Sequence, residues 1–338
     1  MNRAGTRLRA IELVNMWDWD RLHRLVCRRA VRTGRLIRCV SCDILPATPI
    51  SGMVAGKIRT IDGGSNIGGR MDIKANKDLG QNFLFDDAVL HQIADYAALT
   101  PADHVLEIGP GLGTLTTKLC DKAGQVTAVE FDQRLADSLL DNIAKWRLEF
   151  DDLKVPPKNV TVVNQDILRF DLASLPYDYK VVANIPYNLT AKIIKKLLTA
   201  DNAPQTIVLL VQKEVAERLA AHPGKLSVIA ISAQLFAEVE LGIVVPAELF
   251  IPAPKVDSQV VIMHRRAQPL VPKARQAEFF ALVNAGFCEK RKKLKSSLAV
   301  GLHTTKERAE QLLTAAQIDP NRRAQELSID EWRRLADL

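Results

Sequence analysis

The sequence is poor in cysteine and has no long uninterrupted apolar segment. Its 338 residues contain five cysteines, an odd number at irregular spacings, which argues against a disulfide framework and for a reducing compartment. The longest apolar stretch, 226–245, is interrupted by Glu238 and Glu240, so it is too polar to cross a bilayer. These absences exclude a disulfide scaffold and a membrane channel, and we expect no membrane partner.

Potential metal ligands at a useful spacing are also scarce. Cys39 and Cys42 form one half of a zinc-binding pattern, but a four-coordinate site needs further ligands and no second pair is present. We therefore expect no metal site. The composition, with 47% apolar and 25% charged residues, is ordinary for a globular protein and excludes collagen and a fully disordered chain.

The positive charge is concentrated near the N-terminus. Residues 1–70 hold 13 Lys and Arg against 5 Asp and Glu, a net +8, whereas residues 71–338 hold 33 against 34, a net −1. Residue Met71 begins a segment typical of a protein start. Three interpretations stay open for 1–70: a poorly ordered upstream extension, a transit peptide or a basic RNA-binding arm. We expect a cytoplasmic protein, or a mitochondrial one if a transit peptide is present.

Residues 71–265 alternate between short, apolar, β-branched segments and helical patterns. Such alternation is typical of a parallel sheet covered by helices. The predicted strands span 104–108, 125–129, 160–164, 180–183, 206–211, 238–244 and 259–264. The predicted helices between them span 88–98, 114–120, 134–146, 190–200 and 213–221.

After Pro269 only charged helical patterns follow. This change in texture predicts three parts: a basic N-terminal extension over 1–70, a catalytic domain over 71–265 and a small C-terminal helical domain over 266–338.

Three glycines follow the first predicted strand and precede a helix. Gly109, Gly111 and Gly113 are spaced G-x-G-x-G, which lets a ligand approach the bare backbone at the N-terminus of a helix. The spacing differs from the dinucleotide fingerprint G-x-G-x-x-G. Glu130 ends the second strand 17 residues after Gly113, where an acid is placed to accept hydrogen bonds from ribose hydroxyls.

Together with Glu107, this pattern indicates a nucleoside ligand without a pyrophosphate, and S-adenosylmethionine fits it. A glycine turn used only for packing and a nicotinamide-dependent dehydrogenase are the alternatives. Asp166, at the end of the third strand, is placed to accept a hydrogen bond from an adenine amino group. An acid at a strand end is also a common helix cap.

The tetrapeptide Asn184-Ile185-Pro186-Tyr187 follows the fourth predicted strand, at the sheet edge where doubly wound folds bind ligands. Pro186 fixes its own backbone and restricts Ile185, so the Asn184 side-chain oxygen and a backbone carbonyl converge on one small volume. Two convergent acceptors suit a planar exocyclic amine, and Tyr187 can stack on its base. This predicts methyl transfer by in-line attack on a sulfonium, with an ordinary turn as the alternative.

These residues resemble those of the rRNA adenine dimethyltransferase family, and the similarity runs from about Lys77 to Leu298. The resemblance implies a Rossmann-like, S-adenosylmethionine-dependent methyltransferase fold, α/β, with a mostly parallel seven-stranded sheet and a small C-terminal α-helical domain. It implies that segment 79–84 closes over the cofactor. The implied cofactor-binding residues are Asn82, Leu84, Gly109, Gly111, Gly113, Glu130, Asp166 and Asn184.

The loop 250–258 also resembles the family. It implies that Phe250 is a second aromatic residue that sandwiches a flipped base against Tyr187, with a buried loop anchor as the alternative. The implied catalytic set is Asn184, Ile185, Pro186, Tyr187 and Phe250.

The family has two main branches. One dimethylates the 6-amino groups of two adjacent adenines near the 3′ end of small-subunit (16S) rRNA, late in ribosome assembly, and the other modifies a large-subunit adenine and confers antibiotic resistance. Segments 79–83, 250–258 and 285–298 resemble the first branch, whereas Ile185 matches the second. We expect a monomeric small-subunit enzyme that acts on immature subunits. The alternatives are the resistance enzyme, a DNA adenine methyltransferase and a noncatalytic ribosome-assembly factor.

The densest basic run in the neutral part of the chain is expected to contact RNA phosphates. It comprises Lys290, Arg291, Lys292, Lys293 and Lys295. The alternative is a solvated helix face. Further candidates for phosphate contacts are Arg265, Arg266, Arg322 and Arg323. Because a paired base cannot enter a closed pocket, the target adenine is expected to be unpaired or flipped out.

Overall fold

The computed structural model describes residues 75–76, 79–150 and 157–338, and Ala75–Leu338 forms one compact unit. The predicted extension over 1–70, with Cys39 and Cys42, lies outside the described residues. In the described ranges, no helix is long and apolar enough to cross a membrane. No group of three or more His, Cys, Asp or Glu side chains there could hold a metal ion.

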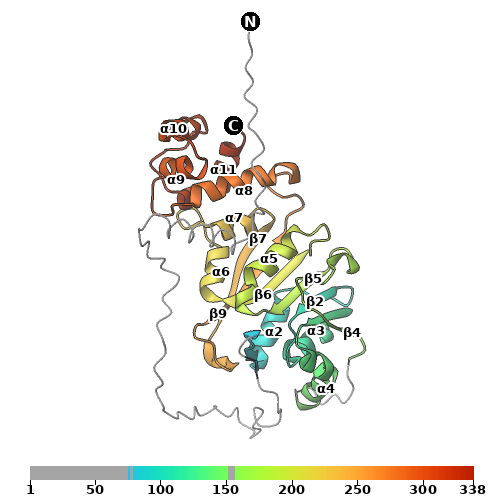
Figure 1. Ribbon diagram of the computed structural model, residues 1–338. Helices are drawn as coiled ribbons and strands as arrows, with labels where there is room; N and C mark the ends of the chain where they lie inside the picture. The colour runs from blue at the N-terminus through green and yellow to red at the C-terminus, as the bar shows by residue number, and fades with distance from the viewer. Residues whose placement is uncertain (1–74, 77–78, 151–156) are drawn as a thin grey trace, which may run out of the picture. The chain divides into compact units, whose positions relative to one another are not determined.

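A seven-stranded sheet forms the centre of this unit (Figure 1). Its strand order is β4-β3-β2-β5-β6-β9-β7. Strands β4, β3, β2, β5 and β6 run parallel to their neighbours, while β9 pairs antiparallel with β6 and β7. The strands are β2 (His104–Ile108), β3 (Gln125–Glu130), β4 (Val160–Asn164), β5 (Lys180–Asn184), β6 (Thr206–Gln212), β7 (Ala237–Val245) and β9 (Ser258–Arg265).

This mostly parallel sheet confirms the predicted α/β fold class. All seven predicted strands are present, and their ends differ from the predicted ends by no more than one residue. The agreement has a simple cause. Strands β5 and β6 are buried along almost their whole length. Strands that are covered on both faces have continuous apolar sequences.

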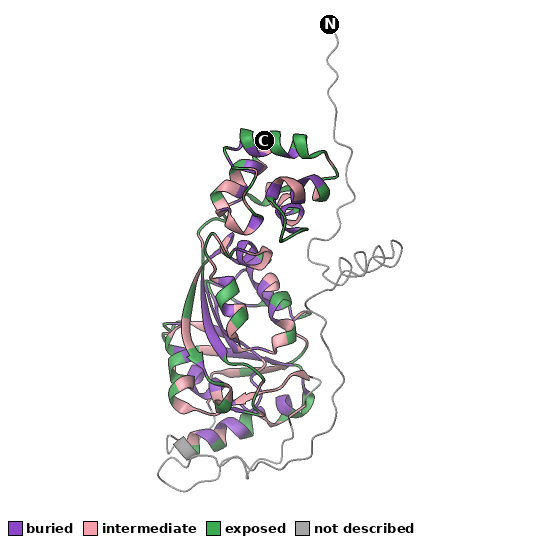
Figure 2. Ribbon diagram, turned by 90° about the vertical axis from the view of Figure 1, so that its left-hand side faces the viewer, coloured by how far each residue is buried: buried purple, intermediate pink, exposed green. Residues whose placement is uncertain are grey.

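Helices cover both faces of the sheet (Figure 2). Those between the strands are α2 (Asp87–Asp95), α3 (Thr114–Lys122), α4 (Gln133–Phe150), α5 (Thr190–Thr199), α6 (Lys213–Leu219) and α7 (Val228–Gln234). Single 3₁₀ turns are η3 (Leu172–Ser174), η4 (Tyr187–Leu189) and η5 (Ala247–Leu249). On one face, Leu90 of α2 and Leu119 of α3 join Val105, Val182 and Val208 of the sheet in one apolar core.

The first five of these helices confirm the prediction, but α7 was not predicted. Its central residues Ala230, Ile231 and Ala233 are fully buried, so the helix has no polar face to give a 3.6-residue period. Ser227 caps it by accepting a hydrogen bond from the Ala230 amide. The helix is therefore marked by its cap and not by periodicity.

A second, two-stranded sheet also escaped prediction. β1 (Phe83–Leu84) pairs antiparallel with β8 (Phe250–Ile251), with Leu84 opposite Phe250. Two-residue strands carry no alternating pattern, so sequence periodicity cannot reveal them. The pairing ties the segment before α2 to the proline-rich loop that lies more than 150 positions later in the chain.

After β9 the described chain is helical. The helices are α8 (Lys273–Phe287), α9 (Leu294–Gly301), α10 (Lys306–Ala315) and α11 (Ile329–Ala336), with the 3₁₀ turn η6 (Ala324–Glu326). Trp332 of α11 is fully buried and stacks on Phe287 with ring centroids 5.9 Å apart. Gly224 and Gln325 join these helices to the α6–α7 loop by reciprocal hydrogen bonds of 2.9 and 3.1 Å. A domain division between residues 265 and 266 stays a prediction.

Candidate active site

A cavity of about 350 Å³ opens at the carboxyl ends of the parallel strands. Its size falls within the range of small-molecule sites. Loops that follow β2, β3, β4 and β5 line it, and the segment 79–84 forms a further wall. Of the predicted cofactor-binding residues, those that line this cavity are Asn82, Leu84, Gly109, Gly111, Glu130, Asp166 and Asn184. The parallel register thus brings together strand ends that are far apart in the sequence.

Gly109 opens the glycine turn at the floor of the cavity. Its amide donates a 2.9 Å hydrogen bond to the Val129 carbonyl, which joins the ends of β2 and β3. Its φ is +68°, and a Cβ atom built there would have no neighbour within 4 Å. The open space beside the backbone is what a closely approaching ligand needs.

Gly113 behaves differently and does not line the cavity. A Cβ atom there would lie 2.9 Å from the Ile143 side chain and 3.0 Å from the Leu139 side chain, both on α4. The Trp146 indole of the same helix donates a 2.9 Å hydrogen bond to the Leu112 carbonyl. Gly113 therefore lets the turn pack against α4, and the structure places it behind the cavity wall.

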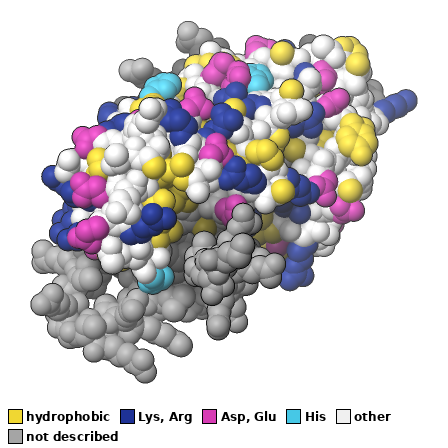
Figure 3. Space-filling model, turned by 90° about the horizontal axis from the view of Figure 1, so that it is seen from above, with side chains coloured by type: hydrophobic (Ala, Val, Ile, Leu, Met, Phe, Trp, Pro, Cys, Tyr) yellow, Lys and Arg dark blue, Asp and Glu magenta, His cyan; other side chains and the backbone are white. Residues whose placement is uncertain are grey.

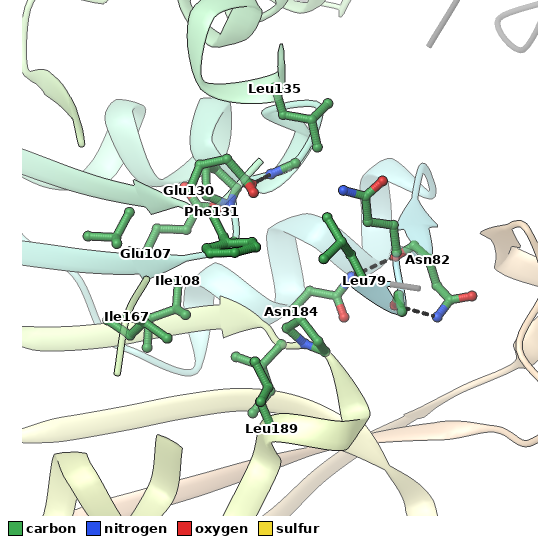
Figure 4. Close-up of a pocket in the computed structure, with 18 of the residues that line it drawn as sticks. Leu79, Asn82, Glu107, Ile108, Glu130, Phe131, Leu135, Ile167, Asn184 and Leu189 are labelled. Carbon is green, nitrogen blue, oxygen red and sulfur yellow. Dashed lines mark hydrogen bonds between the residues drawn. The ribbon is translucent and has the colours of Figure 1, made fainter. Parts of the chain in front are cut away.

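The Glu130 carboxylate is held in one orientation at the end of β3. Its Oε2 accepts a 3.0 Å hydrogen bond from the Gly111 amide, and its Oε1 accepts one of 2.8 Å from the Asp132 amide. Burial raises the pKa of Glu130, whereas these two hydrogen bonds lower it. The carboxylate lines the cavity (Figure 4), so its remaining acceptor capacity suits ligand hydroxyls.

Glu107 is a second carboxyl group in the cavity wall. It is 1% exposed, and its Oε2 atom has no hydrogen-bond partner. Burial raises the pKa of Glu107 to about 8, and the charge on Glu130 acts in the same direction. A hydrogen bond with the Thr116 side chain lowers the pKa but does not offset the burial. A buried oxygen without a partner is costly, so the cavity favours a ligand that compensates it.

The part of the cavity wall that follows β3 and β4 contains residues that the sequence analysis did not select. Phe131 and Ile167 line the cavity (Figure 4), and the Phe131 side chain is 62% exposed. The Phe131 ring therefore offers an accessible aromatic face in the cavity wall. One oxygen of Asp166 accepts a 2.8 Å hydrogen bond from the Leu168 amide, so this acid is both a turn cap and a cavity residue. The sequence did hold a signal for both residues, because Phe131 directly follows Glu130 and Ile167 directly follows Asp166.

A hydrogen bond to the backbone of Asn82 fixes the orientation of the Asn184 side-chain amide. Its Nδ2 donates a 3.1 Å hydrogen bond to the Asn82 carbonyl, and a carbonyl can only accept. The amide nitrogen therefore faces Asn82, which leaves the Oδ1 acceptor for the cavity. Asn82 is itself held, because its Nδ2 donates a 3.0 Å hydrogen bond to the Gly80 carbonyl.

Tyr187 is held by a residue from the distant proline-rich loop. Its hydroxyl lies 2.7 Å from the Ser258 Oγ atom, and Ser258 is fully buried at the start of β9. Burial raises the pKa of Tyr187, which therefore remains protonated. Sequence analysis did not assign a role to Ser258, since the two residues are 71 positions apart.

Phe250 is not brought to the cavity. Its ring is 2% exposed and belongs to the apolar core that contains Leu84 and Leu90. In this conformation it is the buried loop anchor and not a surface for stacking. A role in base stacking stays a prediction that requires the ring to become exposed.

Most of the basic run lies in a turn, so the alternative of a solvated helix face does not describe it, and its contact with RNA stays a prediction. Residues 290–293 are all exposed between α8 and α9. Lys295 instead pairs with Glu310 at 3.1 Å. Arg265 pairs with Asp178, Arg266 with Glu238 and Arg322 with Glu331, so these three arginines have acidic neighbours that compete with phosphates. Figure 3 shows basic and acidic side chains interspersed over the face seen from above.

Three kinds of comparison with known proteins agree with this geometry. The family model described as "Ribosomal RNA adenine dimethylase" matches residues 72–338. A protein of Dehalococcoides mccartyi (strain CBDB1) named "Ribosomal RNA small subunit methyltransferase A" is 39% identical over 266 residues, which cover 78% of this chain and 88% of the relative. A protein of the same name from Bacillus cytotoxicus is 39% identical over 273 residues, covering 77% and 90%.

Two solved structures share the fold over most of their length. The 23S rRNA methyltransferase ErmE is 32% identical, with a TM-score of 0.61 over 76% of this chain and 98% of the other. A dimethyladenosine transferase from Plasmodium falciparum is 25% identical, with a TM-score of 0.61 over 75% and 95%.

The packing at Gly113 predicts an asymmetric effect of alanine in the glycine turn. Gly113→Ala and Gly109→Ala both place a side chain at positive φ, but only the first also meets α4. We expect Gly113→Ala to lower the free energy of unfolding by about 1–3 kcal/mol more than Gly109→Ala does. Urea denaturation of both variants measures the difference, and equal losses would contradict the packing role.

The Tyr187–Ser258 hydrogen bond predicts non-additive effects on stability. Tyr187→Phe and Ser258→Ala remove the same interaction, so the double variant is expected to be about 1 kcal/mol more stable than the sum of the single losses. Tyr177→Phe serves as the matched control, because Tyr177 is 84% exposed and its loss is expected to stay within about 0.5 kcal/mol. Strict additivity in denaturation experiments would argue against the bond.

Proposed function

The chain belongs to the ribosomal RNA adenine dimethylase family, and from this premise we propose its reaction. It transfers methyl groups from S-adenosylmethionine to the 6-amino groups of two adjacent adenines near the 3′ end of small-subunit (16S) rRNA. The names of its 39% identical relatives support the small-subunit assignment. The observation that carries the chemistry is the orientation of Asn184, whose Nδ2 is bound by the Asn82 carbonyl.

The residues of the cavity fit S-adenosylmethionine by their chemistry. Glu130 offers an oriented carboxylate to the ribose hydroxyls, Asp166 offers an acceptor to the adenine amino group, and Phe131 offers an aromatic face to the adenine ring. Gly109 leaves open space for the methionyl part. When bound, the cofactor supplies a methyl group that the positive charge on sulfur has already activated.

The protein orients the target amine and does not need to activate it with a strong base. The Oδ1 of Asn184 and the backbone carbonyl of Ile185 accept the two amine hydrogens, which directs the nitrogen lone pair at the methyl group. Tyr187 stacks on the base, and Ser258 fixes its ring. Catalysis in this arrangement consists of positioning and charge complementarity, which can contribute roughly 7–11 kcal/mol in favourable cases.

A large-subunit methyltransferase is the second candidate. The 32% identity with the 23S rRNA methyltransferase ErmE and the presence of Ile185 favour it. The 39% identity with relatives named for the small subunit favours the first candidate. A noncatalytic assembly factor is less well supported, since the strand-end acids and the tetrapeptide 184–187 are all in place.

We further propose the setting in which the enzyme works. It acts as a monomer in the cytoplasm on immature small subunits during late ribosome biogenesis, and it would act in mitochondria if residues 1–70 serve as a transit peptide. The exposed basic turn 290–293 supplies phosphate contacts. The target adenine leaves its stack to enter the cavity.

The reaction is tested with the full chain, labelled S-adenosylmethionine and two substrates, immature small subunits and large-subunit RNA. We expect dimethyladenosine in the small-subunit RNA alone. Asn184→Ala is expected to slow methyl transfer by at least about 100-fold, because an oriented acceptor is lost, while cofactor binding stays largely intact. Mass analysis of nucleosides reads the product. Label confined to large-subunit RNA would select the second candidate, and cofactor binding without label in either RNA would favour the assembly factor.

The basic turn predicts a change in the salt dependence of RNA binding. Replacing Lys290 and Lys292 by alanine is expected to weaken binding and to reduce the slope of log K against log salt by about 1.5, since two phosphate contacts are lost. Lys295→Ala is the matched control, because Lys295 pairs with Glu310 and contributes less. Filter binding at several salt concentrations gives the slopes, and an unchanged slope would return the turn to an ordinary solvated segment.

A further inference from the structure

Glu107 is a buried acid, and the folded protein does not fully compensate the free-energy cost of ionising it. Its side chain is 1% exposed, it lines the cavity, and its Oε2 atom has no hydrogen-bond partner. It is the next-to-last residue of β2 and directly precedes the glycine turn. An unpartnered acid is an expensive feature to bury without a ligand.

The groups around Glu107 do not supply a positive charge. On the β3 side its neighbour is Glu130, which repels a second negative charge. On the α3 side lie Thr116 and Cys120, and burial keeps the pKa of the Cys120 thiol high, so that this thiol is neutral. Across the cavity, β5 presents the neutral amide of Asn184.

The nearby cations are already paired. Lys118 of α3 lies 2.7 Å from Asp87, and Arg147 of α4 lies 2.6 Å from Asp121. The side chains that shift the pKa of Glu107 are Thr116 and Glu130, and neither is a cation. The missing positive charge must therefore come from a ligand if Glu107 is to ionise near neutral pH.

The two states of the proposed cofactor differ by one positive charge at sulfur. S-adenosylmethionine carries a sulfonium, and its product S-adenosylhomocysteine carries a neutral thioether. We propose that Glu107 is a specificity-determining residue that distinguishes these two states by its own protonation. The inference rests on the proposed function, since it takes S-adenosylmethionine as the methyl donor.

The proton balance of this device is simple. Binding of the sulfonium form converts the Glu107 carboxylic acid to a carboxylate and releases its proton to solvent. After methyl transfer the sulfur is neutral, so Glu107 takes up a proton from solvent and loses the part of its attraction that came from the sulfonium. The protein thereby holds the methyl donor more tightly than the spent cofactor.

The direction of the pH dependence follows from the free protein. Because the pKa of Glu107 is about 8 without ligand, most molecules must lose this proton to bind the sulfonium at neutral pH. If the sulfonium lowers the pKa by about 1–3 units, the ratio of the two affinities, sulfonium over thioether, rises roughly five- to twentyfold from pH 6.5 to 8.5. The α-ammonium group is common to both ligands, so its effect on Glu107 cancels in this ratio.

Isothermal titration calorimetry of the full chain tests the proposal without requiring turnover. Titrations at pH 7 with S-adenosylmethionine or S-adenosylhomocysteine, in two buffers of different ionisation enthalpy, count the protons exchanged. We expect the sulfonium to release more protons than the thioether does, by between about half a proton and one proton. Glu107→Gln is expected to abolish this difference and the pH dependence of the affinity ratio. Ionisations of the ligands are common to both proteins and cancel in the comparison.

Glu130→Gln is the matched control. Both ligands carry the same ribose, so this variant is expected to weaken both by a similar factor and to keep the difference in proton release. Equal proton release for the two ligands, or none for either, would overturn the role of Glu107 while leaving the methyltransferase assignment intact. Failure of S-adenosylmethionine to bind at all would instead count against the proposed function. Circular dichroism checks that Glu107→Gln is folded, and the two wild-type titrations decide the question if it is not.

Discussion

The parallel register of the central strands is the constraint on which the site depends. β2, β3, β4 and β5 are neighbours that all point the same way, so residues at their carboxyl ends meet at one sheet edge. Glu107, Glu130, Asp166 and Asn184 come from four separate strand ends or the loops that follow them. None of them is close to the others in sequence, and an antiparallel arrangement of the same strands would scatter them over two edges.

This arrangement places the carboxyl groups of Glu107 and Glu130 in the buried wall of the cavity, and the two differ in their hydrogen bonds. Glu130 is satisfied by two backbone amides, which hold it as an acceptor of fixed direction. Glu107 retains an unpartnered oxygen and a raised pKa. The difference matters because a satisfied acid recognises hydroxyl groups, whereas an unsatisfied one responds to charge. The two carboxyl groups therefore support the proposed ligand, which carries both ribose hydroxyls and a positive charge.

The tetrapeptide 184–187 depends on two segments that lie far from it in the sequence. The Asn82 carbonyl turns the Asn184 amide, and Ser258 holds the Tyr187 hydroxyl. The small sheet of β1 and β8 joins these two supporting segments to each other. A change in either segment therefore alters the geometry of the tetrapeptide without touching the substrate, and this is why both segments belong to the site.

The sequence by itself determined the α/β class and all seven strands of the main sheet, and seven of its eight predicted cofactor-binding residues line the cavity. It could do so because strands buried on both faces have continuous apolar sequences, and the residues that bind ligands directly follow such strands. Only the tertiary structure decided which predicted residues share the cavity. It set Gly113 against α4, buried Phe250 in the core and paired Lys295 with Glu310. It also revealed Phe131, Ser258, the helix α7 and the sheet of β1 and β8. These features depend on contacts between residues distant in the chain, or lack periodicity, and neither property leaves a local signal in the sequence.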